Sequence, residues 1–154
     1  MELRKYRPYD YDNIIELFYG VVHSVNAADY NEAQLDAWAP KDKALFSLEN
    51  RLSGNYAVVA EKDGIIVGFG SVNGLGYFDC LYTHRDYQGL GVATLIANDI
   101  ENYFYKEGVK IITTDASITA KPFFEKRGYV VLQEQNVECR GQYFINYKMQ
   151  KFFD

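Results

Sequence analysis

The sequence predicts one α/β domain. Its sheet is expected to be mixed and mostly antiparallel, with a central parallel pair of strands and flanking helices. Short apolar runs between Tyr56 and Thr83 are separated by the turn residues Asp63-Gly64 and Asn73-Gly74-Leu75-Gly76, as antiparallel strands would be. A helical pattern then leads to a further strand-like run, and a helical crossover joins parallel strands. Two final runs flank Arg140-Gly141 and predict a terminal hairpin.

Length and composition narrow the class of protein. A chain of 154 residues is expected to form a single domain over 1–154. It carries 16 basic and 21 acidic residues without a basic run, which argues against nucleic-acid binding. Cys80 and Cys139 lack the spacing of metal ligands, so no metal is expected. No apolar run is long enough to span a membrane, and no signal peptide is recognised. A cytoplasmic protein with reduced thiols is the expectation.

The N-terminal third is expected to supply one strand and three helices. Asp10 and Asn31 precede helical patterns and have side chains suited to capping them. The expected elements are a strand over 2–6, a helix with apolar positions over 14–25, a short helix that stops before Pro40, and a helix over 44–52 that is broken by Ser53-Gly54-Asn55.

The rest of the chain alternates strands and helices. Gly68 and Gly70 lie inside a strand pattern and indicate a bulge or a close approach of another element. Gly108 and Gly128 follow helical patterns and are expected to cap them. The expected elements are strands over 56–61, 65–72 and 77–83, a long helix from about 89 to 106, a strand over 109–115, a helix over 119–127, and strands over 129–139 and 142–151.

The junction from strand 77–83 into the long helix carries the main functional signal. It contains Gln88, Gly89, Leu90, Gly91, Val92, Ala93 and Thr94. Glycine permits positive φ and a close approach to a ligand, and the first amides of a helix lack partners and attract anions, above all phosphate. The stretch is not a G-x-x-x-x-G-K-[ST] loop, because the Lys-Ser/Thr pair is missing. It is not a dinucleotide-binding G-x-G-x-x-G either, because the sixth position is threonine.

The pattern that remains is Q-x-x-G-x-A, formed by Gln88, Gly91 and Ala93. It resembles the pyrophosphate-binding signature R/Q-x-x-G-x-G/A of the GNAT superfamily of N-acetyltransferases. The predicted order of elements is similar to the GNAT fold over nearly the whole chain.

A second similarity lies between Ser117 and Tyr129, where that superfamily often reads N-x-x-A-x-x-F-Y-x-x-x-G-F/Y. Ala120, Phe123, Gly128 and Tyr129 fit this pattern. Ser117 stands where asparagine is common. Phe124 stands where tyrosine is common, and this departure bears on the mechanism.

The resemblance implies an acetyl-CoA-dependent N-acetyltransferase that transfers the acetyl group directly to the amine of a small molecule, an amino acid or a peptide. It places the pyrophosphate on the amides from Gln88 to Thr94. It places the pantetheine arm along Leu81, Tyr82 and Thr83, where the two parallel strands separate. A backbone N–H near Leu81 or Tyr82 would stabilise the oxyanion. Plain strand packing is the alternative role for these three residues.

The second motif is expected to complete the cofactor site. Ser117 and Phe124 would lie beside the cofactor. Lys121 could contact the CoA phosphates, although an ordinary solvated helix face explains it equally well.

The catalytic residues are less well defined, because the tyrosine that often protonates the thiolate in this family is replaced by Phe124. Tyr82, Tyr129 or Tyr143 could supply the proton instead, or the thiolate could leave without a proton donor. Asp79 and His23 are candidates for the general base. On strict alternation, Asp79, Leu81 and Thr83 would share one face of their strand. The alternative for either candidate is a hydrogen-bonded structural residue.

The segment from His23 to Trp38 is rich in polar and aromatic residues. His23, Tyr30 and Trp38 are therefore expected to line an acceptor pocket, with core packing as the alternative. A covalent route through Cys80 is disfavoured, because a buried cysteine commonly behaves as a small hydrophobic residue.

Two other functions stay open. Because Phe124 replaces the usual tyrosine, the chain could be a non-catalytic acyl-CoA-binding or sensing domain. A nucleotide-phosphate binder is the third possibility. The edge strands of the terminal hairpin could also pair in a homodimer.

Overall fold

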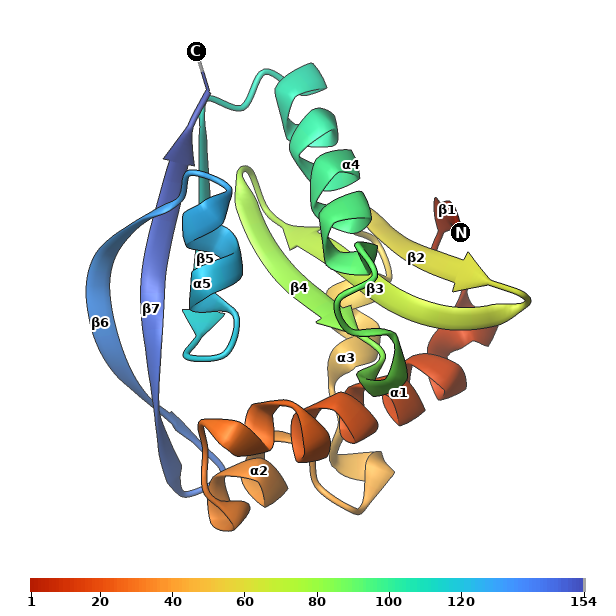
Figure 1. Cartoon of the computed structure of the whole chain (residues 1–154), viewed down its shortest axis with the longest axis vertical. Helices are drawn as coiled ribbons and strands as arrows, with labels where there is room; N and C mark the ends of the chain where they lie inside the picture. The colour runs from red at the N-terminus through yellow and green to blue at the C-terminus, as the bar shows by residue number, and fades with distance from the viewer. Residues whose placement is uncertain (154) are drawn as a thin grey trace.

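A computed structural model of the chain describes residues 1–153, in which seven strands form one sheet (Figure 1). The strands are β1 (Glu2–Lys5), β2 (Ala57–Lys62), β3 (Ile65–Asn73), β4 (Tyr77–Thr83), β5 (Ile111–Ser117), β6 (Val130–Cys139) and β7 (Gln142–Phe152). The α-helices are α1 (Tyr11–Ser24), α2 (Glu32–Trp38), α3 (Leu48–Leu52), α4 (Val92–Lys106) and α5 (Lys121–Lys126). Short 3₁₀ turns η1 to η4 cover Pro8–Asp10, Asn26–Ala28, Lys43–Leu45 and Arg85–Tyr87.

The strand order is β1-β2-β3-β4-β5-β7-β6. Only β4 and β5 are parallel, and all other neighbours run antiparallel. This confirms the predicted mixed sheet with one central parallel pair. The final hairpin inserts β7 beside β5 and leaves β6 at the edge, an arrangement that the sequence pattern did not predict.

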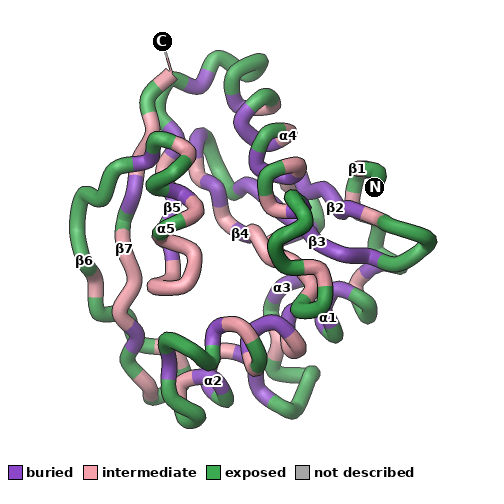
Figure 2. The backbone as a smooth tube through the Cα atoms, viewed as in Figure 1, coloured by how far each residue is buried: buried purple, intermediate pink, exposed green. Residues whose placement is uncertain are grey.

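Helices cover both faces of the sheet and enclose two apolar cores (Figures 1 and 2). Helices α1, α2 and α3 pack on one face, where Phe18 and Leu52 meet Phe69. Helices α4 and α5 pack on the other face, where Ile100 and Phe124 belong to the second core. The alternation of side chains along the strands separates the cores, since successive residues point to opposite faces.

A bulge and a divergence of strands shape the centre of the sheet. Ser71 pairs with Cys80 and Val72 with Phe78, so Asp79 is an extra residue in β4. The parallel ladder to β5 holds only at Tyr77 and Phe78, and the strands separate beyond that point (Figure 1). Because a bulge breaks the period of two, the prediction that Asp79 and Leu81 share a face was wrong. Leu81 packs against the core under α4 and α5, whereas Asp79 contacts α3.

Most expected elements are present, with two differences near the N-terminus. The helix expected over 44–52 is a 3₁₀ turn followed by the short helix α3, because the backbone at Phe46 is extended (φ −76°, ψ 139°). Asn31 caps α2 as predicted, accepting from the Gln34 N–H at 2.8 Å. The Asp10 carboxylate does not cap α1. It accepts hydrogen bonds from Arg4 instead.

Within residues 1–153, no helix has both the length and the apolar character needed to cross a lipid bilayer.

Candidate active site

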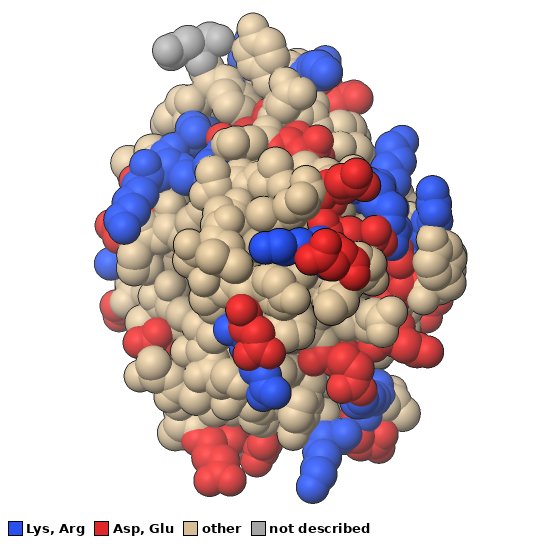
Figure 3. All heavy atoms as spheres, turned by 45° about the vertical axis from the view of Figure 1, so that its right-hand side comes forward, with Lys and Arg blue, Asp and Glu red and all other residues tan. Residues whose placement is uncertain are grey.

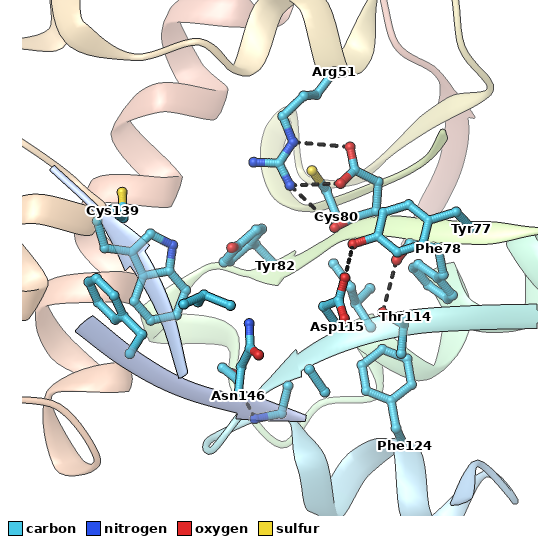
Figure 4. Close-up of a pocket in the computed structure, with 18 of the residues that line it drawn as sticks. Arg51, Tyr77, Phe78, Cys80, Tyr82, Thr114, Asp115, Phe124, Cys139 and Asn146 are labelled. Atoms are coloured by element: carbon cyan, nitrogen blue, oxygen red, sulfur yellow. Dashed lines mark hydrogen bonds and ion pairs between the residues drawn. The ribbon is translucent and has the colours of Figure 1, made fainter. Parts of the chain in front are cut away.

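A cavity of about 370 Å³ lies where β4 and β5 separate (Figure 4). It is bounded by both strands, by α5, by α3 and by the final hairpin. The polar or ionisable side chains on its wall are Tyr30, Trp38, Arg51, Tyr77, Asp79, Cys80, Tyr82, Thr114, Asp115, Ser117, Cys139 and Asn146. The apolar part of the wall includes Leu81, Ala120, Phe124, Val137 and Phe144.

The glycine turn leads from the end of β4 into α4. Gly89 (φ +74°) and Gly91 (φ +83°) adopt the left-handed conformation that favours glycine. A Cβ at either position would have no heavy atom within 4 Å, so the space beside the turn is open. Gln88 donates from Nε2 to the Thr83 carbonyl at 2.8 Å and ties the turn to β4. No side chain caps Gly91, and the first amides of this 15-residue helix are therefore free to bind an anion.

Basic side chains do not gather into one patch on the face that Figure 3 shows. On the face that Figure 3 shows, acidic and basic side chains are interspersed, and the chain carries a net charge of −5. Anion binding at the turn would thus come from backbone amides and the helix dipole.

Helix α4 is positioned by its close approach to β3. A Cβ at Gly68 would lie 2.5 Å from Val92 Cγ1, and a Cβ at Gly70 would lie 2.6 Å from Ile96 Cγ2. The two glycines thus let the first turns of α4 sit directly on the sheet. This confirms the close approach expected at these positions, and it fixes where the N-terminus of α4 points.

Some of the expected cofactor residues line the cavity, and the others, among them those of the glycine turn, lie outside it. Leu81, Tyr82, Ser117 and Phe124 line the cavity. Thr83 accepts from Gln88 outside it. Leu90 is 54% exposed on the turn, while the Val92 side chain is 2% exposed, so Val92 could contribute only its backbone to a ligand.

Lys121 lies with its Nζ over the ring of Tyr147, 4.6 Å from the ring centroid. It does not line the cavity. Ser117 Oγ accepts from the Ala120 N–H at 3.0 Å and starts the turn into α5.

Asp79 reaches the cavity as one half of an ion pair. Arg51 of α3 donates to both carboxylate oxygens, from Nε at 3.0 Å and from Nη2 at 2.8 Å. The Asp79 side chain is 7% exposed and that of Arg51 is 42% exposed. Burial alone would lower the pKa of Arg51, but the Asp79 carboxylate outweighs it and raises that pKa. The pair is thus a fixed feature of the wall.

A second carboxylate, that of Asp115, lines the same cavity. The Tyr77 hydroxyl donates to Asp115 Oδ2 at 2.6 Å, across the gap between β4 and β5 (Figure 4). Gln135 donates from Nε2 to Asp115 Oδ1 at 2.9 Å and to Asn146 Oδ1 at 3.0 Å. Burial and the neighbouring Asp115 raise the pKa of Tyr77, so Tyr77 stays protonated.

The sulfur and phenol groups next to the bulge are held in their neutral forms. Burial raises the pKa of Cys80 to about 11, which disfavours a thiolate nucleophile. Tyr82 packs against Phe18 and Phe69, with ring centroids 5.0 and 5.4 Å away. Burial also raises the pKa of Tyr82. A phenol with a raised pKa is a weaker proton donor, although Tyr82 does border the cavity.

The other two candidate acids lie elsewhere. Tyr129 is buried and donates to Glu101 at 2.9 Å, and Tyr143 is 61% exposed. Neither lines the cavity. Phe124 does, packed edge-on against Phe78 with ring centroids 5.6 Å apart.

The acceptor residues expected from the sequence are only partly brought together. Tyr30 and Trp38 line the cavity with Phe144, and their rings pack edge-on 5.4 Å apart. The Tyr30 hydroxyl donates to the Ile145 carbonyl at 2.7 Å and accepts from the Ile118 N–H at 3.0 Å. His23 lies outside the cavity, stacked on Tyr19, with Nε2 2.8 Å from the Ala39 carbonyl.

The sequence interpretation missed six polar or ionisable residues of the wall: Arg51, Tyr77, Thr114, Asp115, Cys139 and Asn146. Tyr77 and Asp115 lie on the two strands predicted to be parallel, so their proximity would have followed from the register of that pair. No sequence signal linked Arg51 or Asn146 to the site.

Comparison with known proteins gives a consistent result. The family model described as "Acetyltransferase (GNAT) domain" matches residues 26–151. The uncharacterized N-acetyltransferase YafP of Escherichia coli (strain K12) is 32% identical to this chain over 149 residues. The match covers 97% of this chain and 94% of YafP.

Two solved structures show the same architecture. One, from Rhodopseudomonas palustris, is described as a GCN5-related N-acetyltransferase, "Aminotransferase, Class-II". It is similar with a TM-score of 0.93 and 37% identity, over 99% of this chain and 95% of that chain. The PaiA N-acetyltransferase of Thermoplasma acidophilum, solved in complex with coenzyme A, has a TM-score of 0.79 and 17% identity. It covers 99% of this chain and 98% of that chain, and the likeness concerns the fold.

Proposed function

The chain belongs to the GNAT family of acetyltransferases, and on that premise we propose that it acetylates the amine of a small molecule, an amino acid or a peptide terminus by direct transfer. It is an acyltransferase, and its co-substrate is acetyl-CoA. One observation carries the proposal. The open glycine turn before α4 lies at the end of β4, the strand that separates from β5 around the cavity.

The residues at this junction fit a CoA molecule in two places. The backbone from Gln88 to Thr94 offers free amides and unobstructed space at Gly89 and Gly91 for the pyrophosphate. The edge of β4 beyond Phe78 has no ladder partner on the β5 side. A pantetheine arm can fill that vacant edge as an added strand would, bonding the backbone from Leu81 to Thr83.

The bulge supports a role for β4 in stabilising charge during the transfer. It changes the course of the strand at Asp79, two residues before Leu81. A backbone N–H at Leu81 or Tyr82 would then point into the gap between the strands. In a water-poor cavity, such a fixed donor stabilises the oxyanion that forms at the acetyl carbonyl.

Direct transfer is favoured over a covalent route because Cys80, the cysteine of β4, is kept protonated by burial. The acceptor would enter from the side of Tyr30, Trp38 and Phe144. Aromatic faces suit an ammonium or an apolar amine, and they do not by themselves name the acceptor.

Thermal unfolding with acetyl-CoA, CoA and ATP tests the proposal first. A ligand at about 100 times its Kd that binds only the folded state adds about 2.7 kcal/mol to stability. Acetyl-CoA and CoA should raise Tm, and ATP should not. A panel of amines is then screened for thiol release from acetyl-CoA. Tight acetyl-CoA binding without release for any amine would favour a sensing domain, and no Tm shift with either CoA form would refute the proposed site.

A further inference from the structure

The cavity contains two carboxylates, and their surroundings differ. Asp79 is bound through both oxygens by the Arg51 guanidinium. Asp115 is held by two neutral donors, the Tyr77 hydroxyl and the Gln135 amide. Each carboxylate oxygen can accept more than one hydrogen bond, so Asp115 keeps acceptor capacity and a negative charge that no described cation pairs with at close range.

Asp115 also lies on the side of the sheet from which an acceptor can approach. Its neighbours in the chain, Thr114 and Ala116, are buried, and Ala116 belongs to the core under α4 and α5. By the alternation of a strand, Asp115 points to the opposite face. Tyr77 does the same, because its neighbour Phe78 belongs to that core too. Tyr77 and Asp115 therefore point to the face opposite the core under α4 and α5, and both line the cavity.

We propose that Asp115, oriented by the Tyr77 hydroxyl, binds the ammonium group of the acceptor and takes its proton. This inference rests on the proposed function. An alkylamine has a pKa of roughly 10 and is mostly protonated at neutral pH. It must lose a proton before its lone pair can attack. Asp79 is less suited to this task, since an ammonium would have to displace or share the guanidinium of Arg51.

The proton and bond changes balance as follows. The ammonium gives one proton to Asp115, whose exposed carboxyl passes it to solvent. The nitrogen lone pair forms the N–C bond to the acetyl carbon, and the C–S bond breaks. The second nitrogen proton ends on the CoA sulfur, directly or through water. Tyr77 stays protonated throughout and acts as a positioning residue.

Tyr77 of β4 is bonded to Asp115, and Lys148 of β7 is paired with it in the sheet. The other charged or titratable side chains on the cavity wall are Tyr30, Arg51, Asp79, Cys80, Tyr82 and Cys139. Lys148 is the register partner of Asp115, but no ion pair joins the two in the described chain. Arg51 is already matched by Asp79. The cavity wall at Asp115 therefore suits a cation that the acceptor supplies.

A pair of small primary amines that differ strongly in basicity separates proton removal from other roles of Asp115. Ethylamine is protonated at pH 7, whereas 2,2,2-trifluoroethylamine is largely neutral because fluorine withdraws electrons. Asp115→Asn should lower kcat/KM for ethylamine by about a hundredfold, and the loss for trifluoroethylamine should be much smaller. Tyr77→Phe should show the same selectivity with a smaller loss.

A second pair of residues provides a matched control. Tyr56 donates to Asp99 at 2.6 Å, the same distance as in the Tyr77–Asp115 pair, and neither residue lines the cavity. Asp99→Asn and Tyr56→Phe should leave kcat/KM for both amines unchanged. Equal losses for both amines in Asp115→Asn, or no loss, would overturn the proposal. So would the selective loss appearing in Asp79→Asn or His23→Ala instead.

Amine binding gives a readout that does not need turnover. Calorimetric titration of the CoA-bound protein with ethylamine at pH 7 should show affinity that falls about tenfold or more in Asp115→Asn, because a charge-assisted contact is lost. Unchanged affinity would overturn the assignment of Asp115. If the wild type binds ethylamine through Asp115 but releases no thiol with any amine, the proposed function fails while the ammonium site stands.

Discussion

The guanidinium of Arg51 binds both oxygens of the Asp79 carboxylate, although the two residues are 28 positions apart in the chain. The contact covers the bulge at which β4 departs from regular pairing. It also fixes one wall of the cavity, because both residues line it. The pair thus links the position of α3 to the shape of the site.

The ion pair predicts a measurable coupling energy. Arg51→Met leaves a nearly buried carboxylate unpaired and should cost about 1–3 kcal/mol of unfolding free energy. Removing both charges in Arg51→Met/Asp79→Asn should recover part of that loss. Urea unfolding of the two single variants and the double variant measures the coupling. Strictly additive losses would contradict a direct interaction.

The glycine turn predicts a loss of CoA affinity with the fold preserved. Gly91→Val places a β-branched residue at φ +83° and fills the open space beside the first amides of α4. CoA binding should be lost in titration calorimetry, while circular dichroism and cooperative unfolding are retained. The strain at positive φ should cost about 1–2 kcal/mol.

Gly108→Val is the matched control for this strain. Gly108 follows the other end of α4, with φ +78° and no heavy atom within 4 Å of an added Cβ. The Gly108→Val variant should lose about as much stability as Gly91→Val and should keep its affinity for CoA. Equal losses of affinity in both variants would show that the turn at Gly91 is not the binding site.

The packing of α4 on β3 predicts a different kind of defect. A Cβ at Gly70 would lie 2.6 Å from Ile96 Cγ2 and 2.9 Å from Ile100 Cδ1. Gly70→Ala should therefore push α4 from the sheet and cost about 1–3 kcal/mol. Because the helix carries the turn at its N-terminus, CoA affinity should fall as well. Ile96→Ala in the Gly70→Ala background should restore part of the stability and part of the CoA affinity. Urea unfolding measures the first and titration calorimetry the second.

Much of the fold was predictable because local signals and long-range pairing agree. Asp63-Gly64 and Arg140-Gly141 both adopt positive φ, as hairpin turns of this kind require. Strand β4 has the predicted bounds, and the helix after it begins one residue past Gly91. The crossover then makes β5 parallel to β4.

The site was less predictable, because its chemistry depends on register and on one bulge. Without the bulge at Asp79, alternation would have placed Asp79 and Leu81 together. Arg51 reaches the cavity from a helix whose length was itself overestimated. The Tyr77–Asp115 contact requires the register of two strands that are 38 positions apart in the chain at these residues. Local patterns contain none of these facts.

The buried thiol predicts that transfer does not pass through an acetyl-cysteine. With a pKa of about 11, Cys80 is about one part in 10⁴ thiolate at pH 7. Cys80→Ala should retain acetyl transfer within about twofold, while the small cavity costs about 1 kcal/mol of stability. Mass spectrometry of the wild type with acetyl-CoA should find no acetyl group on Cys80. Loss of activity in Cys80→Ala, together with an acetylated peptide, would require the covalent route.

A buried carboxylate of α4 predicts how the stability of the fold depends on pH. Glu101 is 8% exposed and accepts hydrogen bonds from Arg127, Lys151 and Tyr129. Burial raises its pKa, but the bonds from Arg127 and Lys151 outweigh burial and lower the pKa below its usual range. A carboxyl group whose pKa is lower in the folded state contributes fully above the unfolded pKa of about 4.3. That contribution is lost as the pH falls through the folded value.

Glu101→Gln should accordingly lose about 2–4 kcal/mol at pH 7, because two cations lose their carboxylate. The variant should also show a shallower fall in Tm below about pH 5. Part of the fall of Tm with decreasing pH should persist in this variant, because Arg4 lowers the pKa of Asp10 as well. Glu125→Gln changes an exposed carboxylate of α5 and should leave both the pH 7 stability and the acid slope unchanged. Parallel Tm–pH curves for wild type and Glu101→Gln would contradict this account, because they would mean that the carboxyl titrates alike in the folded and unfolded chains.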